Sequence, residues 1–274
     1  SLKHSNPNYI IWAIICSILT YPAAAGVYTI ISVYPIRYLR TLLISIATSF
    51  TSRLLPASSG AMATEARFLN KSGYSPVEAG SLVALNNLIG FMGHMLILFI
   101  VAGLTKTSLS SIITIPVSRK VLIFAGIIIA IAIITIVSIK KLRRKARKLL
   151  VDLRRDISKL LREPGRFAFA LVCAMLITSL YAGALYFCAQ SAGQTITVLQ
   201  AFFVLTVGVT AASVTPTPGG IGGAEAGLVA GFVSIGMDSS TALSISLIYR
   251  LITFWLPIVP GFIAFHHASE KKYI

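Results

Sequence analysis

Apolar residues dominate this chain in long runs that short polar stretches separate. A bilayer crossing needs about 20 such residues in a helix. The runs that satisfy this length predict membrane-spanning helices over residues 9–33, 77–104, 120–139, 167–192 and 239–265. The pattern therefore predicts an all-α protein with several spans.

Two further apolar segments are shorter, and each runs into a cluster of helix-breaking residues. Residues 35–55 lead to Pro56 and Gly60, and residues 195–214 lead to a stretch that contains Pro216, Pro218 and Gly219. A short helix follows each break and is expected to end at Gly73 or Gly236, because glycine favours the helix C-terminus. Each unit is expected to be a re-entrant hairpin, over residues 35–73 and 195–236.

The two breaks share a spacing. In each, Gly follows Pro after four residues and Glu follows after nine: Pro56, Gly60 and Glu65 in the first, and Pro216, Gly220 and Glu225 in the second. Broken helices that recur in the two halves of a membrane protein are typical of transporters with inverted repeats. We therefore expect a first repeat over 1–104, a connecting span and basic helix over 105–165, and a second repeat over 166–274.

Charge sets the expected orientation. The 274 residues carry a net charge of +16, and the mean hydropathy is +0.84. Basic residues concentrate in 140–166, where leucines and isoleucines fall on one helical face, so this segment is predicted to be an amphipathic helix at the membrane surface. The positive-inside rule places it and the C-terminal tail in the cytoplasm of a multi-pass cell-membrane protein. The hairpin tips would then meet near the midplane.

Composition excludes other classes of site. The three cysteines, Cys16, Cys173 and Cys188, lie in apolar segments without a CxxC pair, so neither a metal site nor a cofactor is predicted. The basic charge lacks a nucleic-acid-binding motif, which argues against nucleic acid as a partner. Membrane lipids, with an anionic or lipid-linked substrate, are the expected partners, and a homo-oligomer is compatible with the sequence.

The breaks also carry the candidate chemistry. A helix that restarts after a break exposes free N–H groups that attract anions. Backbone and hydroxyl donors at the breaks, with nearby arginines, predict a headgroup site formed by Ser58, Ser59, Gly60, Glu65, Arg67, Pro216, Pro218, Gly219, Gly220, Gly222, Gly223, Glu225 and Arg250, supplemented by Thr215 and Thr217. The two glutamates could bind a cationic headgroup, carry a proton, pair with Arg67 and Arg250, or cap their own breaks.

The sequence resembles the flippase-like family that includes the transmembrane region of lysylphosphatidylglycerol synthases and related integral membrane proteins. The resemblance rests on Pro216-Thr-Pro-Gly-Gly-Ile-Gly-Gly-Ala-Glu225-Ala-Gly227 and, more weakly, on Pro56, Gly60, Glu65, Arg67 and Gly73. It implies movement of a phospholipid or lipid-linked headgroup between leaflets. The sequence contains no soluble acyltransferase domain, so we do not expect this chain to synthesise lysyl-lipid.

Two alternatives remain beside a lipid flippase. An intramembrane lipid pyrophosphatase would need Ser58, Ser59, Glu65 and Arg67 to supply a nucleophile, a base and a phosphate clamp. A small-solute transporter would need a sealed polar vestibule, whereas a cavity that opens sideways to the bilayer would favour a lipid.

Overall fold

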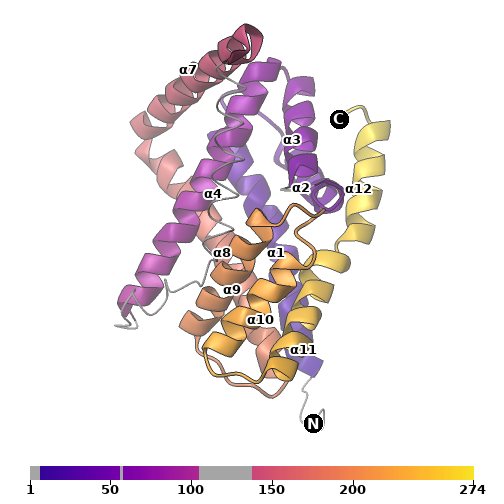
Figure 1. The fold of residues 1–274 in the computed structure, drawn as a ribbon. Coiled ribbons are helices and arrows are strands. Elements are labelled where there is room, and N and C mark those ends of the chain that lie inside the picture. Colours follow the sequence, from indigo (N-terminus) through magenta and orange to yellow (C-terminus); the bar gives the residue numbers. More distant parts are fainter. Residues whose placement is uncertain (1–6, 56–57, 105–137) are drawn as a thin grey trace.

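The computed structural model describes residues 7–55, 58–104 and 138–274, and every regular element in these residues is helical. The predicted connector 105–118 and most of the predicted span 120–139 lie outside the described residues, as do Pro56 and Ala57 of the first break. Figure 1 shows the helices packed side by side along one long axis, with α7 across one end.

Long apolar helices form the frame of the molecule. Among the described residues, four helices are long and apolar enough to cross a membrane, at Asn8–Ile31, Pro76–Leu104, Pro164–Ser191 and Ser239–Glu270. They correspond to α1 (Pro7–Ile31), α4 (Pro76–Leu104), α8 (Pro164–Ser191) and the run of α11 (Ser239–Arg250), η2 (Leu251–Trp255) and α12 (Ile258–Glu270). The all-α prediction is confirmed for the described residues, and the four predicted segments are helices of the length and apolar composition that a span requires.

The last span differs from the single helix expected over 239–265. It contains the π-helical turn η2, in which the Leu256 N–H donates to the Leu251 carbonyl at 2.8 Å. Pro257 follows immediately and lacks an N–H for the carbonyl one turn earlier. A proline and a π-turn together interrupt the helix, and such turns often occur at functional sites.

Each predicted break separates two short helices. α2 (Tyr38–Thr51) and α3 (Ser59–Lys71) flank the first, and α9 (Val198–Val214) and α10 (Gly223–Ser234) flank the second. In both pairs the two helices pack against each other. In Figure 1 the pair α2–α3 lies in the upper half of the molecule and the pair α9–α10 in the lower half.

Small residues allow the paired helices to approach closely. A Cβ added at Gly227 would lie 2.9 Å from the Val207 carbonyl oxygen, and one at Gly231 would lie 3.0 Å from the Val204 Cα. In the first pair, a Cβ at Gly60 would collide with the Thr51 carbonyl. Both pairs are therefore held together by backbone contact, as small residues permit between membrane helices.

Local signals fix the turns at the ends of the helices. Ser75 and Glu78 form a reciprocal capping box at the start of α4, and Thr197 and Gln200 form one at the start of α9. Asp238 accepts hydrogen bonds from the Ser240 and Thr241 N–H groups at the start of α11. The expected helix ends before Gly73 and Gly236 are confirmed.

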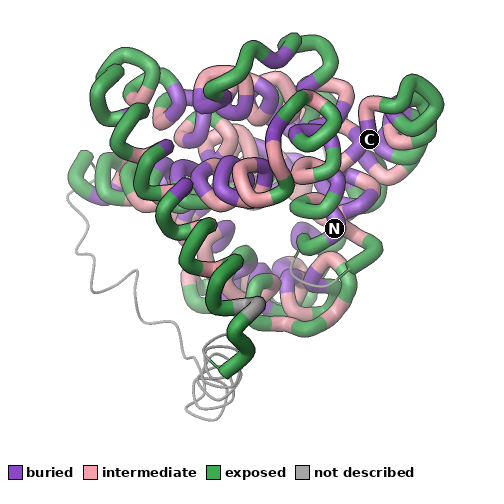
Figure 2. The backbone as a smooth tube through the Cα atoms, turned by 90° about the horizontal axis from the view of Figure 1, so that it is seen from above, coloured by how far each residue is buried: buried purple, intermediate pink, exposed green. Residues whose placement is uncertain are grey.

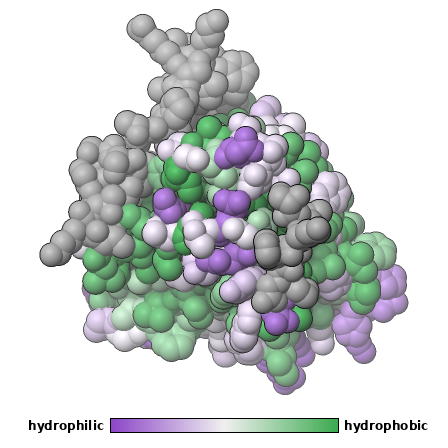
Figure 3. All heavy atoms as spheres, turned by 90° about the horizontal axis from the view of Figure 1, so that it is seen from below, coloured by the Kyte–Doolittle hydropathy of each residue, from purple (hydrophilic) through white to green (hydrophobic). Residues whose placement is uncertain are grey.

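The helices are buried on their inward faces and exposed outward, as Figure 2 shows. Two apolar clusters result, one around Leu69, Leu82 and Ile89 and the other around Leu185, Leu228 and Phe232. Seen from below, hydrophobic side chains cover broad areas of the surface, and hydrophilic ones gather near the middle and along one edge (Figure 3). Extensive apolar surface of this kind is suited to lipid contact.

The basic helix α7 (Lys140–Arg162) packs more closely on the protein than a solvated surface helix would. Leu153, Ile157 and Leu160 contact the first apolar cluster, whereas Leu150 and Leu161 remain exposed. The Ser81 hydroxyl of α4 donates to Asp156 Oδ2 at 3.0 Å. The apolar face predicted for this helix therefore serves two purposes, because one part joins the core and the other faces outward.

Candidate functional site

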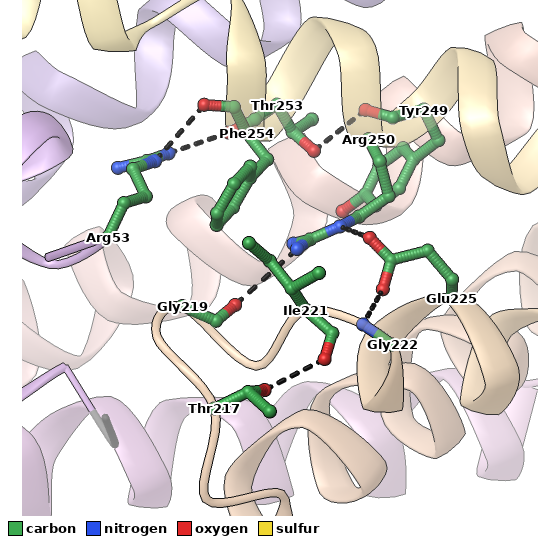
Figure 4. Close-up of polar contacts among 10 residues, drawn as sticks. All are labelled: Arg53, Thr217, Gly219, Ile221, Gly222, Glu225, Tyr249, Arg250, Thr253 and Phe254. Atoms are coloured by element: carbon green, nitrogen blue, oxygen red, sulfur yellow. Dashed lines mark hydrogen bonds and ion pairs between the residues drawn. The ribbon is translucent and has the colours of Figure 1, made fainter. Parts of the chain in front are cut away.

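The second break carries a half-buried ion pair. Arg250 Nε donates to Glu225 Oε1 at 2.6 Å, and the two side chains are only 11% and 18% exposed. Glu225 Oε2 also accepts from the Gly222 N–H at 2.7 Å (Figure 4). Two of the roles considered for this glutamate thus occur together, because it caps its own helix and holds Arg250.

Arg250 is fixed on its other sides as well. Its guanidinium lies 3.9 Å from the centre of the Phe254 ring, and Nη2 donates to the Gly219 carbonyl at 3.4 Å. A cation over an aromatic face gains about 0.5–2 kcal/mol, more when it is desolvated. The arginine therefore joins the last span to the tip of the break.

Gly219 lies directly beneath this ring. Its φ is +61°, and a Cβ there would collide with the Phe254 ring and lie 3.5 Å from the Arg53 Cα. Only glycine combines this backbone conformation with such close approach. The tip of the second break therefore lies close to Arg53, two residues past the end of α2, in the other half of the chain.

Arg53 makes the corresponding contact from the first half. Its Nη2 donates to the Thr253 carbonyl at 2.9 Å and its Nε to the Phe254 carbonyl at 3.1 Å (Figure 4). Pro257 provides no N–H for Thr253, so the arginine satisfies an acceptor that the proline leaves free. The Arg53 guanidinium also lies 5.0 Å from the Phe254 ring centre.

Arg53 is a site residue that the sequence alone did not identify. The available signal was the combination of an arginine at the edge of one break with a proline inside the last apolar span. Neither residue alone indicates a contact across about 200 positions of sequence, and only the folded chain brings them together.

These residues border a cavity of about 560 Å³ between the two breaks. Its polar lining combines two arginines with hydroxyl groups and a histidine: Ser52, Arg53, Ser58, His94, Thr178, Tyr181, Tyr249, Arg250 and Thr253. Apolar side chains complete the wall, and two of them, Phe91 and Val209, are 62% and 51% exposed. The wall formed by α4 and α9 is therefore open to the outside.

The predicted site residues divide between several places. Ser58, Gly219 and Arg250 line the cavity, and Glu225 lies behind Arg250. Thr215 and Thr217 donate to the carbonyls of Ala211 and Ile221 in their own segment. The remaining residues of the second break shape its turns or the start of α10: Pro216, Pro218, Gly220, Gly222 and Gly223.

The first break contributes fewer of its predicted residues. Glu65 lies midway along α3, where it accepts a hydrogen bond of 2.6 Å from the Tyr28 hydroxyl and borders a separate small cavity. Arg67 is exposed, Ser59 begins α3, and Gly60 packs against Thr51. The structure thus does not bring Ser58, Glu65 and Arg67 into one constellation.

Comparison with known proteins places this arrangement in a family. The model of the lysylphosphatidylglycerol synthase transmembrane region matches residues 1–261. A membrane protein of Pyrococcus horikoshii, described as UPF0104 membrane protein PH1989, is 37% identical over 76 residues, which are 28% of this chain and 23% of that protein. The matched stretch thus spans about a quarter of that relative's length.

The family match covers both breaks, the cavity between them and nearly all of the helical frame. Together with four helices that are long and apolar enough to cross a bilayer, it identifies a multi-pass membrane protein. This chain belongs to the family of the lysylphosphatidylglycerol synthase transmembrane region.

Proposed function

We propose that this protein moves a phospholipid, or a lipid-linked headgroup, between the two leaflets of a membrane. The observation that carries the proposal is the cavity between the two breaks, which combines two guanidinium groups with an apolar, open wall. Arg53 and Arg250 would attract the phosphate of a headgroup. The exposed wall at Phe91 and Val209 would let acyl chains remain in lipid.

The arrangement of the halves supports an alternating-access mechanism. Helix α2 packs along α12, and His94 of α4 lies within 3.3 Å of Thr206 of α9, so each broken pair touches the last span of the other half. α1 and α8 pack together between them. Contact of each broken pair with the last span of the other half, in addition to that of its own, is the pattern that two inverted repeats with re-entrant hairpins would produce.

In this mechanism the Glu225–Arg250 pair holds the second tip against the last span, and Arg53 holds the first. Movement of one broken pair relative to the opposite span would expose the headgroup to one leaflet at a time. The basic helix α7 and the C-terminal tail, which lie at the same end of the molecule, would face the cytoplasm. Anionic lipid would gather at that surface.

The cavity favours a lipid over a small solute, because its open wall would not seal a soluble molecule from the bilayer. The pyrophosphatase alternative gains no support from the geometry. Ser58 and Glu65 line different cavities, and a nucleophile needs its base within hydrogen-bond reach.

A proteoliposome assay tests the proposal. Protein reconstituted with a fluorescent phosphatidylglycerol should render the inner-leaflet label accessible to dithionite added outside. Glu225→Gln and Arg250→Ala should each slow this by about tenfold or more, since each removes one partner of the charge-assisted hydrogen bond at the proposed headgroup site. Glu163→Gln is the matched control, because Glu163 pairs with Arg166 at an exposed site.

Thermal unfolding in detergent would show that the variants remain folded. Transport at the wild-type rate by both cavity variants would contradict the assigned site. Uptake of a soluble phosphate ester without movement of the lipid label would instead favour a solute transporter.

A further inference from the structure

A second cavity, of about 390 Å³, lies at the end of the molecule that carries the C-terminus and shares no lining residue with the central one. It is formed by the N-terminal end of α2, the C-terminal end of α3 and the segment that follows α12. Its basic lining residues are Arg37, Arg40, Lys71, Lys271 and Lys272. Three segments that are separated in sequence therefore bring their positively charged side chains together around this cavity.

No acidic residue balances this charge among the described residues that line the cavity. The nearest acid along the chain, Glu270, pairs instead with His266 at 3.2 Å. The floor is apolar and buried, with Ile36 and Phe68, and Ser72 and Tyr273 complete the wall. Five cations held around one hollow repel one another unless an anion lies between them.

At this cavity the backbone of Lys272 adopts a positive φ, a conformation that is unfavourable for a residue with a side chain. Four helices of the described chain end with the same turn, in which the N–H of the third residue past the helix donates back to a carbonyl five residues earlier. The turn residue has positive φ and is glycine in three of them, Gly73, Gly193 and Gly236, but in the fourth it is Lys272 at +56°. A side chain there costs about 1 kcal/mol or more relative to glycine.

This turn directs the tail toward α2. The Tyr273 N–H donates to the Ala268 carbonyl at 2.9 Å, and the Tyr273 ring lies 4.7 Å beneath the Arg40 guanidinium. Backbone strain in a folded protein tends to persist where it serves a function. Here a lysine occupies the strained position, and that lysine lines the basic cavity.

We infer that this cavity binds a phosphate-bearing anion, at a site separate from the central cavity. The N-terminus of α2 adds to the attraction, because its N-cap residue Arg37 makes no side-chain cap and the first N–H groups of the helix are free for an anion. The phosphate could come from the headgroup of a membrane lipid or from a soluble phosphate ester, since both offer the same anionic oxygens to arginine and lysine.

The site lies one helix length from the central cavity. α2 has 14 residues, and its N-terminal end borders the basic cavity while Arg53, just beyond its C-terminal end, holds the last span. At 1.5 Å of rise per residue the separation along the helix is about 21 Å. A ligand in the basic cavity would therefore contact the N-terminal end of α2, the same helix whose C-terminal end positions Arg53.

Binding to purified protein tests the inference without any transport measurement. Isothermal titration in detergent would use three probes separately: dioctanoyl phosphatidylglycerol, glycerol 3-phosphate and inorganic pyrophosphate. The double variant Arg37→Gln/Arg40→Gln should weaken binding of at least one probe by about tenfold, a loss of about 1.4 kcal/mol. Arg143→Gln/Arg147→Gln is the control, because it removes two exposed arginines of α7 that line neither cavity.

The probe that loses affinity identifies the source. A loss confined to phosphatidylglycerol assigns the site to a lipid headgroup, and a loss for the soluble phosphates assigns it to a soluble ester. The loss should be the same in an Arg250→Ala background, in which binding at the central cavity is already weakened, so the result stands whether or not the central cavity transports lipid. Equal affinities of the wild-type and Arg37→Gln/Arg40→Gln proteins for all three probes would overturn the inference.

Lys272→Gly tests the strained turn separately. Glycine should raise the Tm by about 2–4 °C, because the positive φ no longer carries a penalty. The same change should weaken anion binding about threefold or more. A raised Tm with unchanged affinity would show that Lys272 takes no part in the site.

Discussion

At the residue scale, the central site depends on a few groups that each satisfy more than one requirement. Glu225 caps the Gly222 N–H and neutralises Arg250, and Arg250 in turn covers the Phe254 ring. A half-buried arginine without its carboxylate would be destabilising, because its charge would lose its partner while part of its hydration is also lost. The glutamate is therefore a structural cap and, in the proposed mechanism, also a part of the transport site.

Substitution of Gly219 tests the close approach of the second break to the Phe254 ring. Alanine there should cost about 1 kcal/mol for its positive φ and about 1–3 kcal/mol more for contact with the confined Phe254 ring. Gly193→Ala is a matched control, since Gly193 also has positive φ, +73°, but has open space around its Cβ position. Denaturant unfolding in micelles should show the larger loss for Gly219→Ala, and equal losses would contradict the proposed close approach.

At the scale of elements, the interrupted last span explains the role of α2. The π-turn η2 and Pro257 leave carbonyls that the helix cannot satisfy, and Arg53 donates to two of them. The Ser49 hydroxyl donates to the Pro257 carbonyl at 2.8 Å. The interruption of the last span is thus stabilised by Ser49 and Arg53, two polar side chains from the other half of the chain.

This compensation predicts coupling between Arg53 and Pro257. Arg53→Met should destabilise the protein by about 1–3 kcal/mol, because buried acceptors lose their donors. In a Pro257→Ala background the loss should be smaller, since alanine restores an N–H one turn after Thr253. A double-mutant cycle measured by unfolding should give a coupling energy of at least about 0.5 kcal/mol, and additive effects would argue against this explanation.

At the scale of the whole molecule, each broken pair contacts both the last span of its own half and that of the other half. The central cavity is lined by residues from both halves, so neither half has a complete cavity of its own. Relative movement of the halves would therefore change access to the cavity. α7 is fastened to α4 at the same end as the tail, through Ser81 and Asp156.

Cysteine labelling tests the proposed membrane topology. In a background with the three native cysteines replaced by alanine, an impermeant maleimide should label the flanks of each hairpin from one side only. Leu39→Cys, Asn70→Cys and Ser158→Cys should react from the side of α7, and Thr195→Cys and Ser239→Cys from the opposite side. Labelling of Thr195→Cys and Ser239→Cys from different sides would show that α9 and α10 together cross the membrane, contrary to the proposal.

Much of this architecture follows from local patterns. Apolar runs of sufficient length determine the spans, and the Pro/Gly clusters determine where the helices break. The ends of α3 and α10 follow from Gly73 and Gly236, because these positions need positive φ. The duplicated break also pointed to the two segments that border the cavity.

The partners across the molecule follow only from the tertiary structure. Glu65 and Glu225 have the same spacing from their prolines, yet Glu65 lies midway along α3 against Tyr28, whereas Glu225 lies at the start of α10 against Arg250. The helices begin at different points relative to the two acids, so the same spacing leads to different neighbours. Arg53 and the basic cavity are likewise formed by residues far apart in sequence.

The sequence by itself determined the spans, the breaks and the family to which the chain belongs, because each depends on short-range periodicity or a contiguous motif. The tertiary structure decided which charges meet: Arg53 with the last span, Arg250 with Glu225, and five cations around one hollow. The physical reason is that long-range packing sets the distances between helices, and electrostatic attraction depends on those distances rather than on separation along the chain.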